Sequence, residues 1–489
     1  MRLRELVKEA GCAPGEIADR EITGVCSDSA KISPGKVFVA ISGLHHDGAA
    51  FAKEAAARGA VLIVSEREVK AGVPCLIVKN AREALARLAD AYYGHPGRSL
   101  CLIGVTGTNG KTSVSMMLHH TLQSAGYTCG LIGTVECRIG RETAEKASSD
   151  RLANMTTPDP EELYPLLARM RDAGVTHAVM EVTSHALAFS KVAPLFFRLA
   201  VFTNLTEDHL DLHGDMEHYY AEKKKLFSAC GEAVISASTA YGERLMGEIA
   251  VPCHAIREGE TIFDIRKNGI NGVAFSLLHG GEKLPFSLPI SGDFSVENGA
   301  LAAKSALCLG LSPNTVQAAL AAFPGVPGRL ERVKGTPDGI SVFLDYAHTP
   351  DALEKLLLSV RGFARGRRIV LLFGCGGDRE RAKRAQMGRI GSRYADLLIL
   401  TSDNCRSEQP EAILADILRG VDKEKPYIVI KDRREAIRFA VCNARQGDVI
   451  LLAGKGHETY EIRGGERLPF SEREIVLSCF TGKEAEHED

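Results

Sequence analysis

The stretch GVTGTNGKTS (104–113) follows the apolar run LCLI (100–103) and places three glycines before a lysine–threonine pair. Glycines let a backbone turn tightly and bring N–H groups close to an anion. Lys111 supplies positive charge, and Thr112 offers an oxygen to Mg²⁺. The residues TSVSMMLHHTLQSAG (112–126) have a helical pattern, and a helix N-terminus also favours an anion. The stretch therefore predicts a phosphate-binding loop between a strand and a helix.

The spacing of this loop departs from the strict phosphate-binding motif. That motif has four residues between its glycines, whereas only Thr108 and Asn109 separate Gly107 from Gly110. A glycine-rich turn that binds no nucleotide is the alternative interpretation. The choice depends on whether the rest of the chain carries other groups that serve a nucleotide.

The composition is that of an ordinary soluble protein, with 45% hydrophobic residues, 25% charged residues and a net charge of −2 over 489 residues. The length suggests about three domains. The small net charge gives no indication of nucleic-acid binding, and no run reaches the ~18 apolar residues of a membrane helix. The start, MRLRELVKEAGCAPGE (1–16), lacks the apolar segment of a secretory signal, so we expect a cytoplasmic protein. Thirteen cysteines without a C-x-x-C pair are then interpreted as reduced and mostly buried.

Joints that carry glycine and proline divide the chain into three expected domains, 1–97, 98–328 and 329–489. Short apolar runs alternate with helical patterns such as AAFAKEAAARGA (49–60) and PDALEKLLLSV (350–360). The runs expected as strands are VFVAI (37–41), VLIVS (61–65), CLIVK (75–79), LCLIGV (100–105), THAVMEV (176–182), FRLAVFTNL (197–205), SVFLDYA (341–347), RRIVLLFG (367–374), DLLILTSD (396–403), YIVIKD (427–432) and DVILLAG (448–454). Continuous apolar strands between helices predict an α/β protein whose parallel sheets are covered on both faces.

Unusual polar sequences stand where seven of these apolar runs end. They are GTNGKT (107–112), EVTSH (181–185), TNLTEDHLD (203–211), DYAHTPD (345–351), GCGGDR (374–379), DNCR (403–406) and GKGHE (454–458). In open parallel sheets, ligands gather beyond the carboxyl ends of the strands. Seven such endings in two domains predict an active site between those domains.

Glu181 and His209 are candidate metal ligands. A carboxylate and an imidazole near phosphate oxygens can hold Mg²⁺ or Mn²⁺, which neutralises charge during phosphoryl transfer. Zinc is the rival, because His209 and His213 stand four residues apart. A metalloprotease helix, however, needs glutamate where Leu210 stands, and Gly214 interrupts the helix. Alongside the glycine-rich loop, magnesium is the better interpretation.

The third domain contains candidate groups for binding a carboxylate. Arginine suits bidentate carboxylate recognition, and Arg379 and Arg406 each stand just past a strand end. Surface arginines are plentiful, and we expect Arg381 and Arg384 to be solvated. The glycines of GKGHE (454–458) permit close backbone approach, and its glutamate can meet a substrate ammonium. A plain strand-to-helix turn is the alternative there.

Together these motifs resemble the Mur ligases, ATP-dependent amide-forming enzymes of peptidoglycan precursor synthesis. The resemblance rests on GTNGKT, TNLTEDHLD, ENGALAA (297–303), PGRLE (327–331) and DYAHTPD. The set GCGGDR, DNCR and GKGHE is narrower and resembles the members that add the third amino acid, diaminopimelate. DSAKISPGKVFVAISG (28–43) and TTPDP (156–160) also match, so the resemblance extends over nearly the whole chain. It implies an N-terminal UDP-binding α/β domain, a central P-loop ATPase-like domain with a parallel sheet, and a C-terminal Rossmann-like α/β domain.

The resemblance implies roles for individual residues. ATP would be bound by Gly107, Thr108, Asn109, Gly110, Lys111, Thr112, Asn298, Arg329 and Asp345, and Mg²⁺ by Thr112, Glu181 and His209. The UDP-linked substrate would be bound by Ser27, Asp28, Ser29, Thr156, Thr157, Ser184 and Lys191. Diaminopimelate would be bound by Arg379, Asp403, Asn404, Arg406, Gly454 through its N–H, and Glu458. The residues expected to be catalytic are Lys111, Glu181, His209 and Lys223.

Lys223 lies in the helical stretch MEHYYAEKKKLF (216–227), which contains three consecutive lysines. A lysine run is usually a solvated face, and we expect this of Lys224 and Lys225. The resemblance alone distinguishes Lys223, since it matches the lysine that the family carbamylates to N6-carboxylysine. That modification turns an ammonium into a carboxylate-like metal ligand.

Four residues depart from the family's usual pattern. Ala30 stands where arginine is usual, and Lys191 replaces a substrate-contacting arginine, which removes a bidentate contact. Ser295 replaces a common asparagine. Cys405 replaces a proline that would have fixed φ near about −65°, so we expect a looser turn before Arg406. The short GTNGKT loop is the family's own form, which favours ATP at the opening stretch.

The implied reaction activates a D-glutamyl carboxylate with the γ-phosphate of ATP, and the amine of diaminopimelate then displaces phosphate. Such chemistry depends on positioning and on charge neutralisation by Mg²⁺ and Lys111. The expected partners are the UDP-linked muramoyl dipeptide, ATP and meso-diaminopimelate, bound by a monomer without nucleic acid or membrane. The alternatives are folylpolyglutamate synthase, a lysine-adding ligase, and a nucleotide-binding regulatory protein that has lost catalysis.

Overall fold

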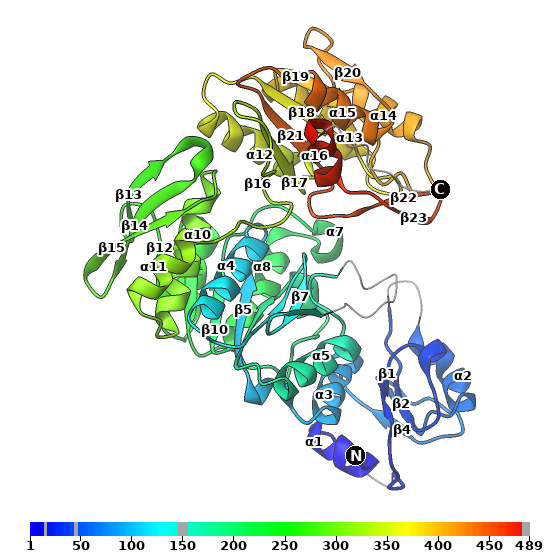
Figure 1. Ribbon diagram of the computed structural model, residues 1–489. Coiled ribbons are helices and arrows are strands. Elements are labelled where there is room, and N and C mark those ends of the chain that lie inside the picture. The colour runs from blue at the N-terminus through cyan, green and yellow to red at the C-terminus, as the bar shows by residue number, and fades with distance from the viewer. Residues whose placement is uncertain (14–16, 44–46, 145–154, 482–489) are drawn as a thin grey trace. The chain divides into compact units, whose positions relative to one another are not determined.

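The computed structural model describes residues 1–13, 17–43, 47–144 and 155–481, drawn as a ribbon in Figure 1. The contacts between residues divide the chain into two compact units. The first unit comprises Met1–Phe263, Leu277–Leu284 and Glu297–Leu320, and the second comprises Asp264–Ser276, Pro285–Val296 and Ala321–Asp489. Each unit contains parallel strands with helices packed on the sheet.

The first unit begins with a four-stranded parallel sheet of order β1-β2-β3-β4. The elements are α1 (Leu3–Glu9), β1 (Gly24–Cys26), β2 (Lys36–Val39), α2 (Ala52–Ala57), β3 (Leu62–Ser65), β4 (Cys75–Ile77) and α3 (Ala81–Tyr92). Because side chains alternate along a strand, Val37 and Val39 pack with α1 and α3, whereas Phe38 packs with α2 on the other face. Ala86 and Ala89 of α3 join the next core instead, so this helix serves two cores.

An eight-stranded sheet of order β12-β11-β10-β5-β9-β6-β7-β8 follows. Its elements are β5 (Cys101–Thr106), α4 (Lys111–Ser124), β6 (Cys129–Ile132), β7 (Cys137–Ile139), β8 (Glu142–Ala144), α5 (Pro160–Asp172), β9 (His177–Glu181), α6 (Ser184–Ala188), β10 (Leu199–Phe202), α7 (Leu210–His213), α8 (Met216–Lys224), β11 (Ala233–Ser236), α9 (Ala240–Glu248) and β12 (Cys253–Ile256), with α10 (Phe294–Cys308) and α11 (Pro313–Ala321) later in the chain. Strands β12 to β6 run parallel, and β7 and β8 are antiparallel additions. Strand β5 lies between β9 and β10, which makes its carboxyl end a switch point of the sheet.

A separate three-stranded sheet, β13-β14-β15, comes between the two larger sheets in the sequence. Its strands are β13 (Ile262–Lys267), β14 (Val273–His279) and β15 (Glu282–Leu288). Alternate residues of β14, namely Val273, Phe275 and Leu277, are buried, and the ring of Phe275 stacks on that of Phe286 at 5.7 Å between centroids. The sequence analysis did not identify these strands.

The second unit contains a six-stranded sheet of order β16-β17-β21-β18-β19-β20, parallel except for β16. The elements are β16 (Glu331–Arg332), β17 (Ser341–Asp345), α12 (Pro350–Phe363), β18 (Ile369–Phe373), α13 (Ala382–Tyr394), β19 (Leu397–Leu400), α14 (Pro410–Leu418), β20 (Tyr427–Val429), α15 (Arg433–Cys442), β21 (Val449–Ala453), β22 (Tyr460–Arg463), β23 (Glu466–Pro469) and α16 (Glu472–Thr481). Leu371 and Leu451 pack with α12, α13 and α14, whereas Val370 and Ile450 pack with α15 and α16. Both faces of the sheet are therefore covered.

The α/β class with parallel sheets is confirmed, and each apolar run expected as a strand contains one. The antiparallel strands at the sheet edges were not predicted. The three domain ranges 1–97, 98–328 and 329–489 stay a prediction.

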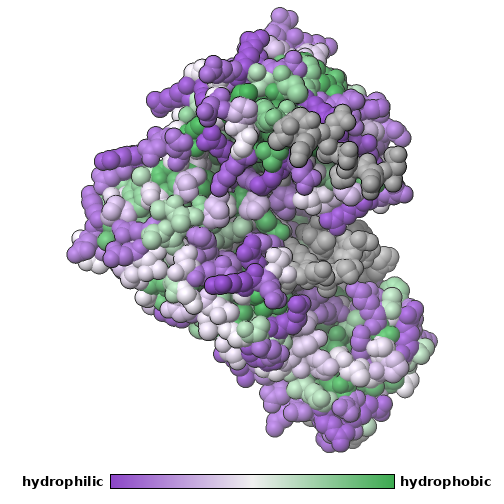
Figure 2. Space-filling model, in the orientation of Figure 1, coloured by the Kyte–Doolittle hydropathy of each residue, from purple (hydrophilic) through white to green (hydrophobic). Residues whose placement is uncertain are grey.

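Across the part of the chain that the structure describes, no helix is both long and apolar enough to cross a bilayer. Figure 2 shows hydrophilic residues spread over the face in view, with apolar residues in smaller separate groups. All thirteen cysteines lie in the described ranges; they form no disulfide, and only Cys442 is exposed.

A buried ion pair fastens α15 to α16 in the second unit. Arg433 Nε donates to Glu472 Oε1 at 2.8 Å, and both side chains are almost completely inaccessible to solvent. The same guanidinium donates to the carbonyl oxygens of Ser402, just after β19, and Ala453, the last residue of β21. It thereby also fixes two strand ends.

We expect Glu472→Gln to destabilise the second unit by about 3–5 kcal/mol, because it leaves the Arg433 charge buried without its counter-ion. Thermal and denaturant unfolding of the full chain would measure the loss. The matched control is Glu474→Gln, which removes the same charge from an exposed position two residues later. Equal stability of the two variants would contradict this role of the pair.

Candidate active site

The glycine-rich loop connects β5 to α4, as predicted. Gly107 has φ +145° and Gly110 has φ +87°, backbone angles that residues other than glycine rarely adopt. A Cβ atom on Gly107 would collide with Thr203 Oγ1, and one on Gly110 would lie 2.5 Å from Asn298 Oδ1. The two glycines therefore allow the close approach of neighbouring segments, and Asn298 lies beside the loop as expected of an ATP contact.

Two lysine side chains meet at one carbonyl oxygen of the loop. Lys111 Nζ donates to the carbonyl oxygens of Gly107 at 3.0 Å and Thr108 at 2.9 Å. Lys223 Nζ donates to the same Gly107 oxygen at 2.8 Å. The structure thus brings together two residues that are 112 positions apart and that only the family resemblance had associated.

Lys223 is fully buried, with its Nζ 4.7 Å from the centre of the Tyr219 ring. Burial and, after it, the charge of Lys111 lower the pKa of Lys223 well below its ordinary value. Lys225 is exposed and Lys224 is half-buried; they pair with Glu222 and Glu248 respectively. The solvated face expected of the run is therefore confirmed for Lys225 and only partly for Lys224.

Glu181 is the last residue of β9 and lies beside Val105 of β5 in the register of the sheet. Its buried carboxylate accepts hydrogen bonds from Thr112 Oγ1 at 3.0 Å, from Thr134 Oγ1 at 3.0 Å and from the Thr134 N–H at 2.9 Å. Hydroxyl and carboxylate oxygens are the donors that Mg²⁺ prefers. The Thr112–Glu181 pair therefore fits magnesium. Thr134, which also binds this carboxylate, was not identified from the sequence.

His209 lies immediately before α7 with φ +54°. Its exposed ring lies 4.7 Å from that of His185, centroid to centroid. Burial, followed by the charges of His209 and His213, lowers the pKa of His185 to about 4. His213 Nε2 instead contacts Ser184 Oγ at 3.0 Å. No group of three metal-ligating side chains among the described residues includes His209 or His213, so the zinc alternative gains no support.

The loop is also held by residues that follow β10. Thr203 Oγ1 donates to Asn109 O at 2.6 Å, and Asn204 Oδ1 accepts from the Asn109 N–H at 2.9 Å. Thr108 Oγ1 donates to Thr206 O at 3.1 Å. Three polar residues of TNLTEDHLD thus position the loop, although the sequence analysis named only the histidine.

A cavity of about 240 Å³ lies within the first unit, and two of the residues predicted to bind the UDP-linked substrate, Ser27 and Lys191, line it. Ser27 donates from both its N–H and its hydroxyl to the Glu161 carboxylate. Lys191 Nζ pairs with Asp159 Oδ1 at 2.7 Å and donates to Thr157 O at 3.2 Å. The cavity is also lined by residues not identified from the sequence, namely Ile41, Arg82, Leu85, Asp159, Pro160, Glu161 and Phe189.

Four of the five other residues predicted for this substrate divide into two groups. Thr156 Oγ1 contacts Thr134 Oγ1 at 2.9 Å, and Thr157 Oγ1 donates to Glu181 O at 2.8 Å, so both join the network around Glu181. Asp28 accepts from the Ala30 N–H and caps a short 3-10 helix that begins at the half-buried Ser29. In the structure Asp28 has a local capping role.

In the second unit, Asp345 ends β17 and accepts the N–H groups of Leu330 at 2.6 Å and Ala347 at 2.8 Å. Desolvation raises the pKa of Asp345, against the lowering effect of Arg329. The Arg329 guanidinium lies over the Tyr346 ring at 5.1 Å. Two of the residues predicted to contact the nucleotide, Arg329 and Asp345, are therefore close together at one strand end.

The residues predicted to bind the amino acid gather around a lysine that the sequence analysis did not identify. Lys455 is fully buried, and its Nζ donates to Asn404 Oδ1 at 3.0 Å and lies 3.6 Å from Asp403 Oδ1. Asn404 Nδ2 donates to Glu458 Oε2 at 2.8 Å. Burial would raise the pKa of Asp403, but the charges of Lys455 and Arg433 lower it. The lysine of GKGHE is thus the central cation of this cluster.

Gly454 does not have the role expected of its N–H. That N–H donates to Asp345 O at 3.0 Å, so the expected clamp on a ligand through this group is wrong. Gly454 has φ +112°, and a Cβ atom there would lie 2.6 Å from Asp403 Oδ2. The glycine is required because of its conformation and because Asp403 packs against it.

Arg406 has φ +52°, and its Nη1 donates to Gly377 O at 2.8 Å and to Asn404 O at 3.4 Å. Its backbone N–H donates to Ile462 O at 3.2 Å. Cys405, expected to loosen this turn, is buried, and its thiol donates to Asp403 O at 3.2 Å. The turn is therefore held by hydrogen bonds in place of proline. Arg379 is exposed. It lies close to Arg406, because a Cβ atom on Gly376 would be near the side chains of both arginines.

One sequence-based expectation about arginine is wrong. Arg384, expected to be solvated, is completely buried and pairs with Glu408 at 2.7 Å and with Asp416 at 3.0 Å. Arg381 is exposed, as expected. Because Glu408 Oε1 also accepts the Asp378 N–H, the buried pair supports the loop that precedes Arg379.

Family models and curated proteins match this chain along most of its length. The matching models are "Mur ligase family, catalytic domain" over residues 21–93, "Mur ligase middle domain" over 105–306 and "Mur ligase, glutamate ligase domain" over 328–456. Two relatives are named UDP-N-acetylmuramoyl-L-alanyl-D-glutamate–2,6-diaminopimelate ligase. The one from Gloeobacter violaceus is 44% identical with 97% of each chain covered, and the one from Caldanaerobacter subterraneus is 42% identical with 99% of this chain and 100% of the relative covered.

Solved structures agree. A structure of a UDP-N-acetylmuramoyl-L-alanyl-D-glutamate–2,6-diaminopimelate ligase has a TM-score of 0.68 at 30% identity, covering 94% of this chain and 95% of that chain. The MurF ligase from Thermotoga maritima in complex with ADP shares the fold, with a TM-score of 0.60 at 19% identity over 93% and 96% of the two chains. With its three domain matches and its full-length relatives, this chain belongs to the Mur ligase family.

Proposed function

We propose that this protein is an ATP-dependent ligase that joins meso-2,6-diaminopimelate to the D-glutamate of UDP-N-acetylmuramoyl-L-alanyl-D-glutamate and releases ADP and phosphate. Relatives that are 39% to 44% identical over nearly the whole chain carry this activity in their names. The structural observation that carries the proposal is the meeting of Lys111, Thr112 and Glu181 at the carboxyl end of β5. These groups suit an enzyme that handles the phosphates of ATP.

In the first step, the D-glutamyl carboxylate attacks the γ-phosphorus of ATP, and an acyl phosphate and ADP form. Lys111 lies inside the loop, where its charge offsets the negative charge that accumulates on the transferred group. When bound, Mg²⁺ supplies further neutralisation of phosphate charge, and Thr112, Glu181 and His209 are the residues that would hold it. Gly107 and Gly110 let backbone N–H groups approach the phosphates.

Lys223 suits carbamylation because carbon dioxide reacts with a neutral amine. Its burial and the neighbouring charge of Lys111 lower the pKa of Lys223, so the neutral amine is accessible. The product carries a negative charge, which the neighbouring ammonium of Lys111 would attract. The proposed modification is therefore electrostatically favourable at this position.

In the second step, the neutral amine of diaminopimelate attacks the acyl carbon, phosphate leaves as the amide forms, and a local base or water accepts the proton that the amine loses. We assign amino-acid binding to the cluster of Asn404, Arg406 and Glu458. A guanidinium has five N–H donors, so the two bonds made by Arg406 Nη1 leave other donors for a carboxylate. That carboxylate on the distal carbon is what separates diaminopimelate from lysine, and an unpaired Arg406 would penalise lysine.

The UDP-linked substrate would enter the cavity lined by Ser27 and Lys191. The protein would act as a cytoplasmic monomer, with ATP and Mg²⁺ drawn from solution. Its product would be consumed by the next step of peptidoglycan precursor synthesis.

Lys111→Ala should lower turnover by at least about 10²-fold, since it removes a positive charge where phosphoryl transfer develops negative charge. Amino-acid-dependent release of ADP measures the effect. Ser124→Ala, at the exposed end of the same helix, is the control and should behave as wild type. A folded Lys111→Ala protein with an unchanged rate would disprove the assignment.

Lys223→Ala should lose activity that formate or acetate partly restores, because a small carboxylate can occupy the position of the carbamate. An exposed lysine two residues later offers a matched control, and Lys225→Ala should retain activity without added acid. Rates measured over a range of acid concentrations would test this. The carbamate proposal fails if Lys223→Ala remains fully active or if no short acid restores any activity.

Arg406→Ala should raise the KM for diaminopimelate by an amount equivalent to about 2–5 kcal/mol, as expected for a lost desolvated charge pair. The KM for ATP should barely change. Arg381→Ala, an exposed arginine nearby, serves as the control for charge alone. Unchanged diaminopimelate kinetics in Arg406→Ala, or equal use of lysine by the wild type, would overturn this specificity argument.

A further inference from the structure

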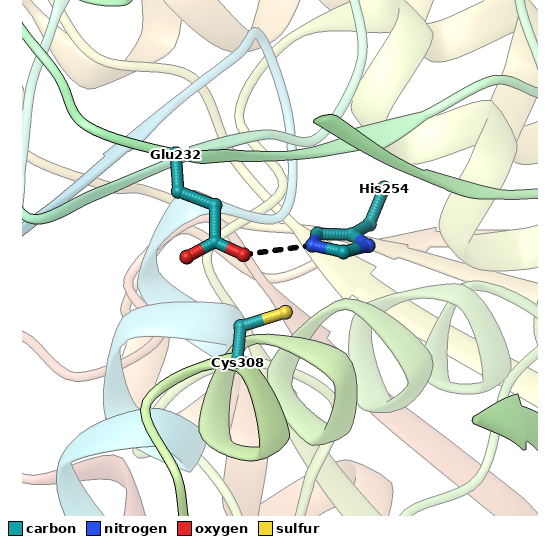
Figure 3. A group of neighbouring side chains, drawn as sticks. All are labelled: Glu232, His254 and Cys308. Carbon is teal, nitrogen blue, oxygen red and sulfur yellow. Dashed lines mark hydrogen bonds and ion pairs between the residues drawn. The ribbon is translucent and has the colours of Figure 1, made fainter. Parts of the chain in front are cut away.

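Glu232, His254 and Cys308 converge at the end of the eight-stranded sheet that is opposite to the phosphate loop (Figure 3). Glu232 stands directly before β11, and His254 is the second residue of β12, so both lie at the amino ends of their strands. Gly107, in contrast, follows the carboxyl end of the parallel strand β5. The active-site assignments above leave this cluster unused.

The fold places the three side chains on one face. His254 pairs with Val234 in the β11–β12 register, and Glu232 precedes Val234 by two residues. Because side chains alternate along a strand, Glu232 and His254 point to the same side of the sheet. Cys308, the last residue of α10, points its sulfur toward these two groups from the helix that lies there.

The distances suit a metal ion. One ligand atom from each residue lies within 4.8 Å of the others, and all three residues are half-buried. Bonds of about 2.0–2.3 Å from zinc to nitrogen, oxygen and sulfur put tetrahedral ligand atoms about 3.5 Å apart. Small side-chain rotations would therefore be enough to bring the three atoms onto one ion.

Hydrogen bonds orient the Glu232 carboxylate, and burial keeps the Cys308 thiol protonated in the metal-free protein. Arg198 Nη1 contacts Glu232 Oε2 at 2.9 Å, while His254 Nε2 contacts the other oxygen at 2.8 Å, so Arg198 orients the carboxylate from outside the cluster. Burial and then the Glu232 charge raise the pKa of the Cys308 thiol to about 11. A bound cation reverses this effect and releases the thiol proton.

Two further groups surround the cluster. Lys304 lies one helical turn before Cys308, and its Nζ contacts His279 Nδ1 at 3.4 Å. A thiolate, an imidazole and a carboxylate are the mixed donors typical of zinc.

We propose that Glu232, His254 and Cys308 form a binding site for Zn²⁺, with water completing a tetrahedral set. The ion would fasten the end of α10 to β11 and β12. Asn298, beside the phosphate loop, lies ten residues earlier on the same helix, about 15 Å along its axis. The site would thus stabilise the helix that reaches the ATP region, independently of the proposed ligase activity.

Titration of metal-free full-length protein with Co²⁺, without ATP, tests this. We expect one equivalent to produce the near-ultraviolet absorption of a thiolate–cobalt bond, which Zn²⁺ then displaces. Cys308→Ser should abolish that absorption, and Glu232→Gln and His254→Ala should weaken binding at least tenfold. Cys253→Ser, next to His254 in β12 but on the opposite face, is the matched control and should bind as wild type.

A stability measurement keeps the test valid if a variant folds poorly. Zn²⁺ should raise the Tm of the wild type and of Cys253→Ser, and should leave the Tm of Cys308→Ser and Cys308→Ala unchanged. The proposal is overturned if the wild type shows no thiolate–cobalt absorption. It is also overturned if the absorption persists at the same affinity in Cys308→Ser, because another cysteine would then be the ligand.

Discussion

The carbonyl oxygen of Gly107 accepts hydrogen bonds from the side-chain nitrogens of both Lys111 and Lys223, and the glycine-rich loop is arranged around this point. Two positive charges that share one acceptor in a partly buried place repel each other strongly, since screening there is weak. The buried lysine relieves this repulsion through its lowered pKa. An anion at the loop would relieve it as well, which supports the proposed binding of the phosphates of ATP there.

The parallel sheet supplies the geometry that this interaction needs. Val105 lies beside Glu181, and Thr106 lies beside Phe202, so the segments that follow β9 and β10 begin next to the glycine-rich loop. Glu181 and Thr203 therefore reach the loop without any long connection. The same rule places Glu232 and His254 at the far end of the sheet, which separates the proposed zinc site from the phosphates.

The cluster assigned to amino-acid binding is held together by the hydrogen bonds of a buried lysine. Lys455 is completely buried. Its hydrogen bonds to Asn404 Oδ1 and Tyr460 O connect the segment after β21 to the segment after β19 and to the start of β22. Buried polar networks of this kind rigidify a site when each member is satisfied. Arg406 is presented by a turn that contains no proline, and the hydrogen bonds of its backbone and guanidinium supply the missing restraint.

The sequence alone determined the α/β class, eleven strands of the parallel sheets and the glycine-rich loop, but it missed the parallel strands β1, β6, β11 and β12. Through the family resemblance it also predicted residues for each substrate. Two of these signals are local in the sequence, namely the apolar runs between helical patterns and the spacing of the glycines. They can therefore be recognised without a structure. The tertiary structure decided what no local signal carries. It buries Arg384 and Lys455 with carboxylates from distant segments, uses the Gly454 N–H within the fold, and brings Cys308 to Glu232 and His254. The physical reason is that a charged side chain is buried only where partners from other parts of the chain compensate for its lost hydration, and those partners are known only once the chain has folded.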